Sequence, residues 1–366
     1  FWLKFGFVAM WLCWLFFASW PEAAGQETCT QPSATPATIP GYFEAYATAH
    51  VQAEMLKDEP RMAAFRSAVE DNAELFRGKT VLDLGAGTGI LSLICARAGA
   101  IRVFAIEASA MAQFAKRIIV ANGFEGVIEV LNVDADELEQ LPGGQKVDII
   151  ISEWIGTFLF HESMLPSVLR ARDKWLAPNG LLLPDGATLF SASLEHINHK
   201  EMELDFFQDV AGFNMSAMVG AWIPAAQQQC VFHKFVNSEV VVLKDISLYN
   251  ATVADVSVWE ATWTTKVTRN DIVSGFVAWF DLQFHRFRGS GKLSFLKTSP
   301  TDPCTHWQQT VFYSARDVPV AANEILHGTT RVDVDPSNGR NLRVQFDVTG
   351  DSSSINETWF VTGAGC

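Results

Sequence analysis

The sequence lacks several features that mark common protein classes. None of its six cysteines forms a C-x-x-C pair or lies near a histidine at zinc-site spacing, so no metal site is predicted. Internal repeats are also missing. Basic residues are scarce, with 27 Lys and Arg against 41 Asp and Glu, and the formal net charge of −14 argues against direct nucleic-acid binding by bulk electrostatics. We expect such a chain to attract cationic partners instead, including Arg- or Lys-rich peptides.

Charged residues make up only 19% of the chain, whereas hydrophobic residues make up 49%. This balance excludes a disordered protein and predicts an ample core. A length of 366 residues suggests two domains. Cys95 lies in an apolar run and is expected to be a buried free thiol.

The N-terminal segment 1–25 contains an uncharged apolar run over residues 5–20, followed by small residues at 23–25. The run is short for a membrane span and resembles the apolar core of a secretory signal. Membrane association through residues 5–20 is therefore one expectation. Glycosylation sequons at Asn214, Asn250 and Asn356 are compatible with secretion. Residues 26–40, rich in Pro, Ser and Thr, indicate a linker.

Strand and helix patterns alternate between residues 79 and 184. Strands are predicted over 80–87, 102–109, 127–135, 146–154 and 181–195, and helices over 89–100, 110–124 and 161–180. This alternation predicts an α/β fold with a Rossmann-like doubly wound parallel sheet in a domain spanning 41–185, preceded within it by helices at 41–77. Residues 186–366 are instead rich in β-branched and aromatic runs and predict an antiparallel β-barrel domain. Within it, segment 206–228 has helical character and is unusually apolar, which indicates an interface.

The run "VLDLGAGTGILSL" (81–93) predicts a cofactor site. Asp83 ends an apolar strand, and Gly85 and Gly87 allow the backbone to approach a ligand closely. Ile90 stands where the dinucleotide fingerprint has its third glycine, which argues against NAD. Glu107, after the second strand, is placed to accept a ribose diol, and Asp136, after the third strand, to touch an adenine edge. This combination resembles S-adenosylmethionine-dependent methyltransferases.

Four stretches in order resemble protein arginine N-methyltransferases, closest to the main type I branch. "SEWIGTFLFHESML" (152–165) is similar to the double-glutamate loop of that family, and "YFEAYATAHVQAEMLKDEPRM" (42–62) to its N-terminal helix. "RDKWLAPNGLLLPDGATL" (172–189) and "THWQQTVFY" (305–313) resemble the segment after the loop and the THW loop of the barrel domain. The resemblance runs from about residue 41 to the C-terminus.

The resemblance makes Glu153 and Glu162 the catalytic pair, and the chemistry agrees. Arginine stays protonated under protein conditions, and its planar fork matches carboxylates bidentately. A methyl donor that is a sulfonium puts a second cation beside the guanidinium. Two carboxylates offset that repulsion and hold the attacking nitrogen in line with the methyl group.

Other roles follow from the resemblance alone. His306 and Asp58 match a pair that accepts the released proton. The remaining residues are expected to line the two ligand sites, with Tyr46 and Trp307 along the arginine slot, Met55 and Met164 near the acceptor nitrogen, Tyr42 and Phe43 over the cofactor, and Arg61 on the carboxylate of its methionine part.

Three positions depart from the family pattern. Gln52 replaces a histidine that contacts the cofactor, although Gln can still form hydrogen bonds, and Ile155 and Thr157 replace Met and Tyr in the double-glutamate loop. These two loop substitutions are expected to affect the positioning of the loop, and with it the rate of methyl transfer or the pattern of methylated products. Because the carboxylates and the glycine loop are intact, activity is expected.

The resemblance predicts a homodimer in which arm 206–228 docks on the cofactor domain of a second subunit. It also predicts Arg/Gly-rich protein substrates, with histones as candidates, and mono- and asymmetric dimethylarginine as products. The expected location is cytoplasm and nucleus, with a membrane-anchored or secretory form as the alternative. Two other functions stay open, a methyltransferase for another acceptor and a non-catalytic binder of Arg-rich segments.

Overall fold

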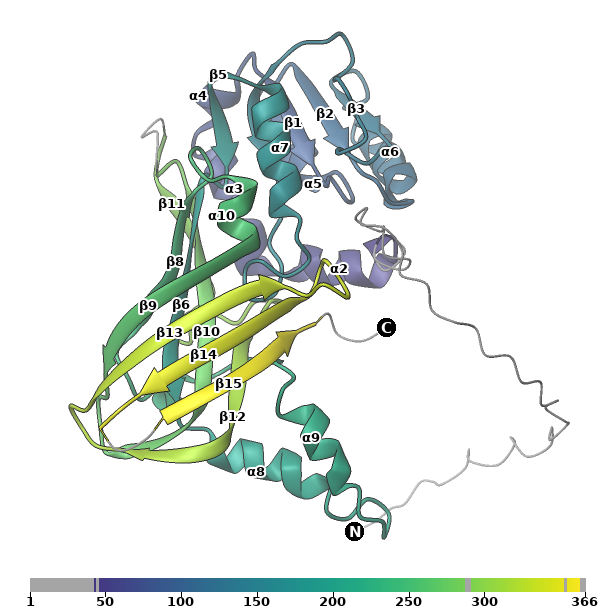
Figure 1. Ribbon diagram of the computed structural model, residues 1–366. Coiled ribbons are helices and arrows are strands. Elements are labelled where there is room, and N and C mark those ends of the chain that lie inside the picture. Colours follow the sequence, from purple (N-terminus) through teal and green to yellow (C-terminus); the bar gives the residue numbers. More distant parts are fainter. Residues whose placement is uncertain (1–42, 44–45, 287–290, 352–353, 363–366) are drawn as a thin grey trace, which may run out of the picture. The chain divides into compact units, whose positions relative to one another are not determined.

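The computed structural model describes residues 43, 46–286, 291–351 and 354–362 (Figure 1). The predicted N-terminal segment 1–25, the linker 26–40 and the proposed cofactor contact Tyr42 lie outside these residues. Across the described ranges, no helix combines the length and the apolar character that crossing a membrane requires.

A parallel sheet of five strands forms the core of the first domain, as the alternating pattern predicts. Its order is β3-β2-β1-β4-β5, so the chain reverses direction of winding between β1 and β4. The strands are β1 (Thr80–Leu84), β2 (Arg102–Ile106), β3 (Ile128–Leu131), β4 (Val147–Ile151) and β5 (Leu176–Leu183). Ligands in such folds bind beyond the carboxyl ends of the strands at this reversal.

Helices connect and precede these strands. The connecting helices are α5 (Ile90–Arg97), α6 (Met111–Ala121) and α7 (Leu165–Trp175), and the preceding ones are α2 (Ala49–Lys57), α3 (Glu59–Glu70) and α4 (Ala73–Phe76). Four of the five residues of β1 and of β2 are buried. Such continuous burial is typical of parallel strands covered on both faces.

Two predicted elements differ from the structure. The helix expected over 161–180 begins only at Leu165 and ends at Trp175, and residues 176–180 belong to β5. Pro178 accounts for the early end, because a proline disfavours helical backbone at the residue before it. The strand expected over 181–195 is divided at Pro184, so that β5 joins the parallel sheet and β6 joins the next one.

The second domain contains two antiparallel sheets, which confirms the predicted barrel-like β domain. One has the order β7-β12-β10-β6-β8 with β11 paired to β10, and the other has the order β15-β14-β13-β9. The first comprises β6 (Gly186–Leu194), β7 (Gln227–Gln229), β8 (Val241–Ser247), β10 (Asp271–Phe284), β11 (Ser294–Lys297) and β12 (Gln309–Val320). The second comprises β9 (Val258–Lys266), β13 (Ile325–Val334), β14 (Leu342–Thr349) and β15 (Ser354–Val361), with the short helix α10 (Val253–Ser257) before β9.

Aromatic side chains join these two sheets. Phe276 of β10 stacks on Phe346 of β14 with ring centroids 4.8 Å apart, and Phe312 of β12 packs edge-on to Trp359 of β15 at 5.6 Å. All four side chains are buried. The core between the sheets therefore comes from the aromatic runs that predicted a β domain.

The expected apolar arm is helical, but its first helix begins before residue 206. It consists of α8 (Ile197–Phe206), η1 (Ser216–Met218) and α9 (Val219–Trp222), and Figure 1 shows α8 and α9 as a helical pair extending from the β domain. Large apolar side chains of the arm are exposed: Met202 60%, Phe206 61%, Phe213 69%, Met215 45% and Met218 47%. Such a surface indicates an interface.

The two domains are joined by buried polar contacts at α3. The His285 ring, through Nε2, lies 3.0 Å from the Ala68 carbonyl oxygen, and Asn72 accepts a hydrogen bond from the Lys292 backbone at 2.5 Å. His285 and Asn72 are both buried. These bonds fix α3, which is capped by Asp58 and carries Arg61 in its first turn, against the β domain.

The structure contains a disulfide that the spacing of the cysteines did not predict. Cys230, after β7, and Cys304, two residues before His306, form a disulfide across a separation of 74 residues. Cys95 is a buried free thiol, as expected. The bridge ties the segment that enters β12 to the end of the arm.

We expect the Cys230–Cys304 bridge to stabilise the fold. Closing a loop of this length removes unfolded-state entropy worth about 4 kcal/mol. The Cys230→Ser/Cys304→Ser variant should lose most of this free energy of unfolding in urea titrations under oxidising conditions. Reductant should lower the stability of the native chain to that of the variant and leave the variant unchanged. A native chain that ignores reductant would contradict the expectation.

Candidate active site

One cavity lies beyond the carboxyl ends of β1, β2 and β4. Its lining combines most of the residues predicted from sequence: Phe43, Tyr46, Gln52, Met55, Arg61, Gly85, Gly87, Glu107, Asp136, Glu153, Glu162 and Met164. Trp154, Ile155, Ser163 and Arg340 complete part of the wall. The N-terminal helices, the glycine loop and the double-glutamate loop therefore meet at a single site.

Two side chains approach the glycine loop so closely that only glycine fits there. Gly85 and Gly87 have φ of 73° and 54°, which favours glycine. A Cβ at Gly85 would lie 2.4 Å from the Met164 Cε, and one at Gly87 would lie 3.0 Å from the Gln52 Oε1. Met164 and Gln52 therefore pack directly against the loop where it borders the cavity.

Glu107 closes this loop on the side of β2. Its Oε2 accepts a hydrogen bond from the Gly87 backbone at 2.7 Å, and its Oε1 accepts one from the Ser109 backbone at 2.8 Å. The carboxylate is thereby fixed at the cavity wall, where the sequence predicts a ribose contact.

Asp83 and Asp136, both predicted to bind the cofactor, differ in their placement relative to the cavity. Asp83 is fully buried behind the loop and does not line the cavity, and its Oδ2 accepts a bond from Ser92 at 2.6 Å. Burial raises the pKa of Asp83 to about 7, against the opposing effect of the Ser92 bonds. Asp136 lines the cavity but also pairs with Arg170 at 2.6 Å, and this bond, against the effect of burial, lowers its pKa.

S-adenosylmethionine fits this cavity. Its amino-acid part carries both charges, its sulfur is cationic and its ribose is a diol. The cavity offers a guanidinium at Arg61, carboxylates at Glu107 and Glu153, and glycine backbone without Cβ atoms between them. These groups match the ligand in charge.

The double-glutamate loop folds back on itself tightly. A Cβ at Gly156 would lie 1.9 Å from the His161 carbonyl oxygen, so only glycine fits there. Phe158, Leu159, Glu162 and Ser163 all have φ between 54° and 75°, which is unfavourable for side-chain-bearing residues. Backbone strain of this kind persists where the surroundings hold it, and it is concentrated at functional sites.

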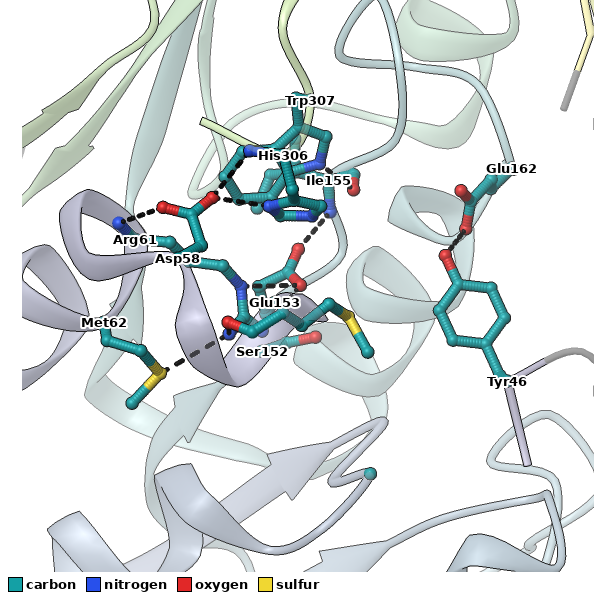
Figure 2. A network of polar contacts seen from close by, with 12 residues as sticks. Tyr46, Asp58, Arg61, Met62, Ser152, Glu153, Ile155, Glu162, His306 and Trp307 are labelled. Atoms are coloured by element: carbon teal, nitrogen blue, oxygen red, sulfur yellow. Dashed lines mark hydrogen bonds and ion pairs between the residues drawn. The ribbon is translucent and has the colours of Figure 1, made fainter. Parts of the chain in front are cut away.

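Glu153 is held by Arg61 and by its own loop. Arg61 Nη2 and Nε donate to the Glu153 Oε2 at 2.9 Å and 3.3 Å, and the Ile155 backbone donates to Oε1 at 3.1 Å (Figure 2). The side chains of Arg61 and Glu153 are 7% and 10% exposed. The sequence assigns Arg61 to the cofactor and does not predict this buried ion pair.

Glu162 is held by Tyr46. The Tyr46 hydroxyl donates to the Glu162 Oε2 at 2.6 Å, and both residues line the cavity (Figure 2). A phenol at one oxygen orients the carboxylate without neutralising its charge. The two glutamates are thus oriented by different donors, a guanidinium and a hydroxyl.

The predicted His306–Asp58 pair is formed. His306 Nδ1 lies 2.6 Å from the Asp58 Oδ2, which also accepts from the His306 backbone at 2.9 Å, and Asp58 Oδ1 accepts from the Arg61 backbone at 3.0 Å (Figure 2). Burial alone would raise the pKa of Asp58, but these hydrogen bonds outweigh it and the pKa is lowered. Asp58 therefore stays ionised beside the ring and also caps α3.

Two other predicted residues have structural contacts. Trp307 does not line the cavity, and its Nε1 donates to the Ile155 carbonyl at 3.0 Å, which fixes the double-glutamate loop. Gln52 lines the cavity and donates to the Tyr46 carbonyl at 2.9 Å, so it holds the segment that carries Tyr46.

Comparisons with known proteins agree with this geometry. Residues 185–353 match the model of an arginine methyltransferase oligomerization subdomain, and residues 81–180 match that of a methyltransferase domain. Protein arginine N-methyltransferase 1 of Caenorhabditis elegans is 40% identical over 319 residues, covering 86% of this chain and 90% of the relative. That of Schizosaccharomyces pombe is 39% identical over 307 residues, covering 84% and 88%.

A solved structure with a similar fold is the Trypanosoma brucei PRMT1 enzyme–prozyme heterotetrameric complex with AdoHcy. It matches with a TM-score of 0.81 and 31% identity, covering 87% of this chain and 100% of that one. Arabidopsis thaliana protein arginine methyltransferase 10 matches with a TM-score of 0.78 and 29% identity, covering 88% and 100%. The chain belongs to the protein arginine N-methyltransferase family.

Proposed function

We propose that this enzyme transfers methyl groups from S-adenosylmethionine to arginine side chains of Arg/Gly-rich proteins, with histones as candidates, and forms mono- and asymmetric dimethylarginine. One observation carries the proposal. Glu153 and Glu162, each oriented by its own donor, line the same cavity as the glycine loop and Glu107. Two carboxylates suit a cationic acceptor, whereas a neutral acceptor would not require them.

The glutamates would bind and polarise the acceptor. Bound S-adenosylmethionine supplies an electrophilic methyl group on a sulfonium. Glu153 and Glu162 accept N–H bonds from the acceptor guanidinium, draw positive charge away from the attacking nitrogen and fix its approach. The cavity wall formed by Met164 and Gly85 restricts where that nitrogen can lie.

The proton released from the acceptor would pass to His306. Because Asp58 engages the ring at Nδ1, Nε2 is the nitrogen that would receive the proton. The ionised Asp58 carboxylate then stabilises the imidazolium, since opposite charges at hydrogen-bond distance favour the charged form.

The assembly would be a homodimer in which the arm docks on the cofactor domain of a second copy. The exposed apolar side chains of α8 and η1 support this, as do Phe114 and Val120 of α6, which are 51% and 59% exposed on the cofactor domain. A partly buried polar cluster anchors the arm. His196 Nδ1 lies 2.8 Å from the Tyr313 hydroxyl, which also accepts from Gln229 at 2.8 Å.

We propose the cytoplasm and nucleus as the location, because S-adenosylmethionine and Arg/Gly-rich RNA-binding proteins are available there. The Cys230–Cys304 bridge and the exposed sequons at Asn214, Asn250 and Asn356 support the membrane-anchored or secretory alternative. Microscopy of a C-terminally tagged protein, with glycosidase treatment, distinguishes the two.

Removing the charge of either glutamate should abolish most of the transfer. Glu153→Gln and Glu162→Gln should each lower kcat about 10²–10³-fold, because pre-oriented charge is lost at the acceptor. The measurement is labelled-methyl transfer to a Gly-Arg-rich peptide, with mass spectrometry of the products. Glu129→Gln, which removes a surface carboxylate paired with Arg102, is the control. Full activity in both catalytic-site variants would refute the mechanism.

A side chain at Gly85 should obstruct the cofactor. Gly85→Ala should weaken binding of S-adenosylmethionine roughly 10- to 100-fold, because the new methyl group would collide with the Met164 Cε and push that side chain into the cavity. Gly123→Ala is a matched control, since Gly123 has the same φ of 73° and no atom within 4 Å of a Cβ there. Calorimetric titration measures the affinity of each variant for S-adenosylmethionine. Equal affinities in Gly85→Ala and Gly123→Ala would show that the glycine loop at Gly85 does not border the bound cofactor.

The anchor of the arm should weaken in acid. Burial, with the neighbouring His199, lowers the pKa of His196 to about 4 from an ordinary 6.5. The unfolded chain therefore binds the proton more readily, and stability falls as pH drops from about 6.5 to about 4. His196→Asn, whose side-chain oxygen can still accept from Tyr313, should show a smaller drop in melting temperature between pH 7 and pH 5. An identical drop in both proteins would contradict this.

A further inference from the structure

The turn between β13 and β14 contacts the backbone of the catalytic Glu162. The Glu162 N–H donates to the Arg340 carbonyl at 2.9 Å, and the Arg340 Nη1 donates back to the Glu162 carbonyl at 2.6 Å. Both polar groups of this peptide segment are therefore bound by one residue, 178 positions away in the chain.

Further contacts extend this attachment to the neighbours of Glu162. The Ser163 hydroxyl donates to the Gly339 carbonyl at 2.8 Å, and the His161 Nε2 lies 3.4 Å from the Asn341 Oδ1. Three consecutive residues of the loop thus meet three consecutive residues of the turn.

The attached residues have backbone conformations that need external support. Glu162 and Ser163 have φ of 75° and 54°, in the left-handed region. Residues with side chains stay there only where the surrounding structure fixes them. The bonds to Arg340 and Gly339 act on these two residues, so the turn selects the conformation that directs the Glu162 carboxylate to the cavity.

Arg340 also reaches the N-terminal segment. Its guanidinium carbon lies 5.6 Å from the centre of the Phe43 ring, within the range of a cation–π contact. Phe43 lines the cavity, and Tyr46, three residues further on, donates to the Glu162 carboxylate. One half-buried side chain thus contacts both segments that border the acceptor carboxylate.

We propose that Arg340 is a positioning residue for methyl transfer, a role that rests on the proposed function. Arg340 lines the cavity, and in this role it acts through Glu162. It holds the backbone of Glu162 in its left-handed conformation and ties it to Phe43, so that the carboxylate meets the acceptor guanidinium in the bidentate orientation. Small displacements of a positioned group are enough to slow a reaction strongly.

The test compares Arg340→Ala, Arg340→Lys and Arg343→Ala. Arg343 is a matched control, because it lies on the same hairpin, is exposed, and pairs with Asp333 across the two strands at 2.7 Å. Methyl transfer to a Gly-Arg-rich peptide gives kcat and KM, calorimetry gives the stoichiometry of S-adenosylmethionine binding, and thermal unfolding reports folding.

We expect Arg340→Ala to lower kcat about 10²-fold while the protein still binds a full equivalent of cofactor. Arg340→Lys, which keeps one donor and the charge, should recover part of this loss, and Arg343→Ala should match the native enzyme. A purely structural role would instead reduce the fraction that binds cofactor and leave kcat per bound site unchanged.

Native kcat per cofactor-binding site in Arg340→Ala would overturn the proposal. If that variant fails to fold, Arg340→Lys decides, and native kcat there overturns it equally. The proposed function is judged separately in the same assay. A native enzyme that does not methylate the peptide overturns both, whereas an active native enzyme with unaffected Arg340 variants overturns only the positioning role.

Discussion

Two carboxylates directed at one small cavity repel each other, and most of the site serves to keep them there. Glu153 is held by a buried guanidinium and Glu162 by a phenol, and each carboxylate stays an acceptor at the cavity wall. Those donors come from the N-terminal segment and from α3, not from the loop that carries the glutamates. The N-terminal helices are therefore part of the candidate active site and not an appendage to the sheet.

The double-glutamate loop is fixed from three sides. The Trp307 indole donates to the Ile155 carbonyl, the turn at Arg340 holds Glu162, and Gly156 allows the loop to close on His161. Two of these supports belong to the β domain. The cofactor domain supplies the chemistry, and the β domain sets the geometry in which the chemistry takes place.

The sequence was informative where local pattern and chemistry coincide. Alternating periodicity predicted the parallel sheet, and the glycine run located its ligand edge. The motif around Glu153 and Glu162 placed both carboxylates at one cavity. The sequence was uninformative where a contact joins residues that lie far apart in the chain. Nothing near Arg340 or in the cysteine spacing signals a partner, because those contacts depend on how distant segments meet in the fold. The helix end at Trp175 was missed because β5 begins at Leu176, before the Pro-Asn-Gly stretch that was expected to end the helix, and its pairing with β4 is interrupted at that stretch and resumes at Leu181.

The disulfide also changes the topology of the chain. Between Cys230 and Cys304 the polypeptide becomes a covalent ring that contains β8 to β11. A single protease cut anywhere in 231–303 would open this ring without separating the halves, so the segment bearing His306 would remain linked to the first domain. Electrophoresis without reductant would then show a single species, and the two pieces would separate only after reduction.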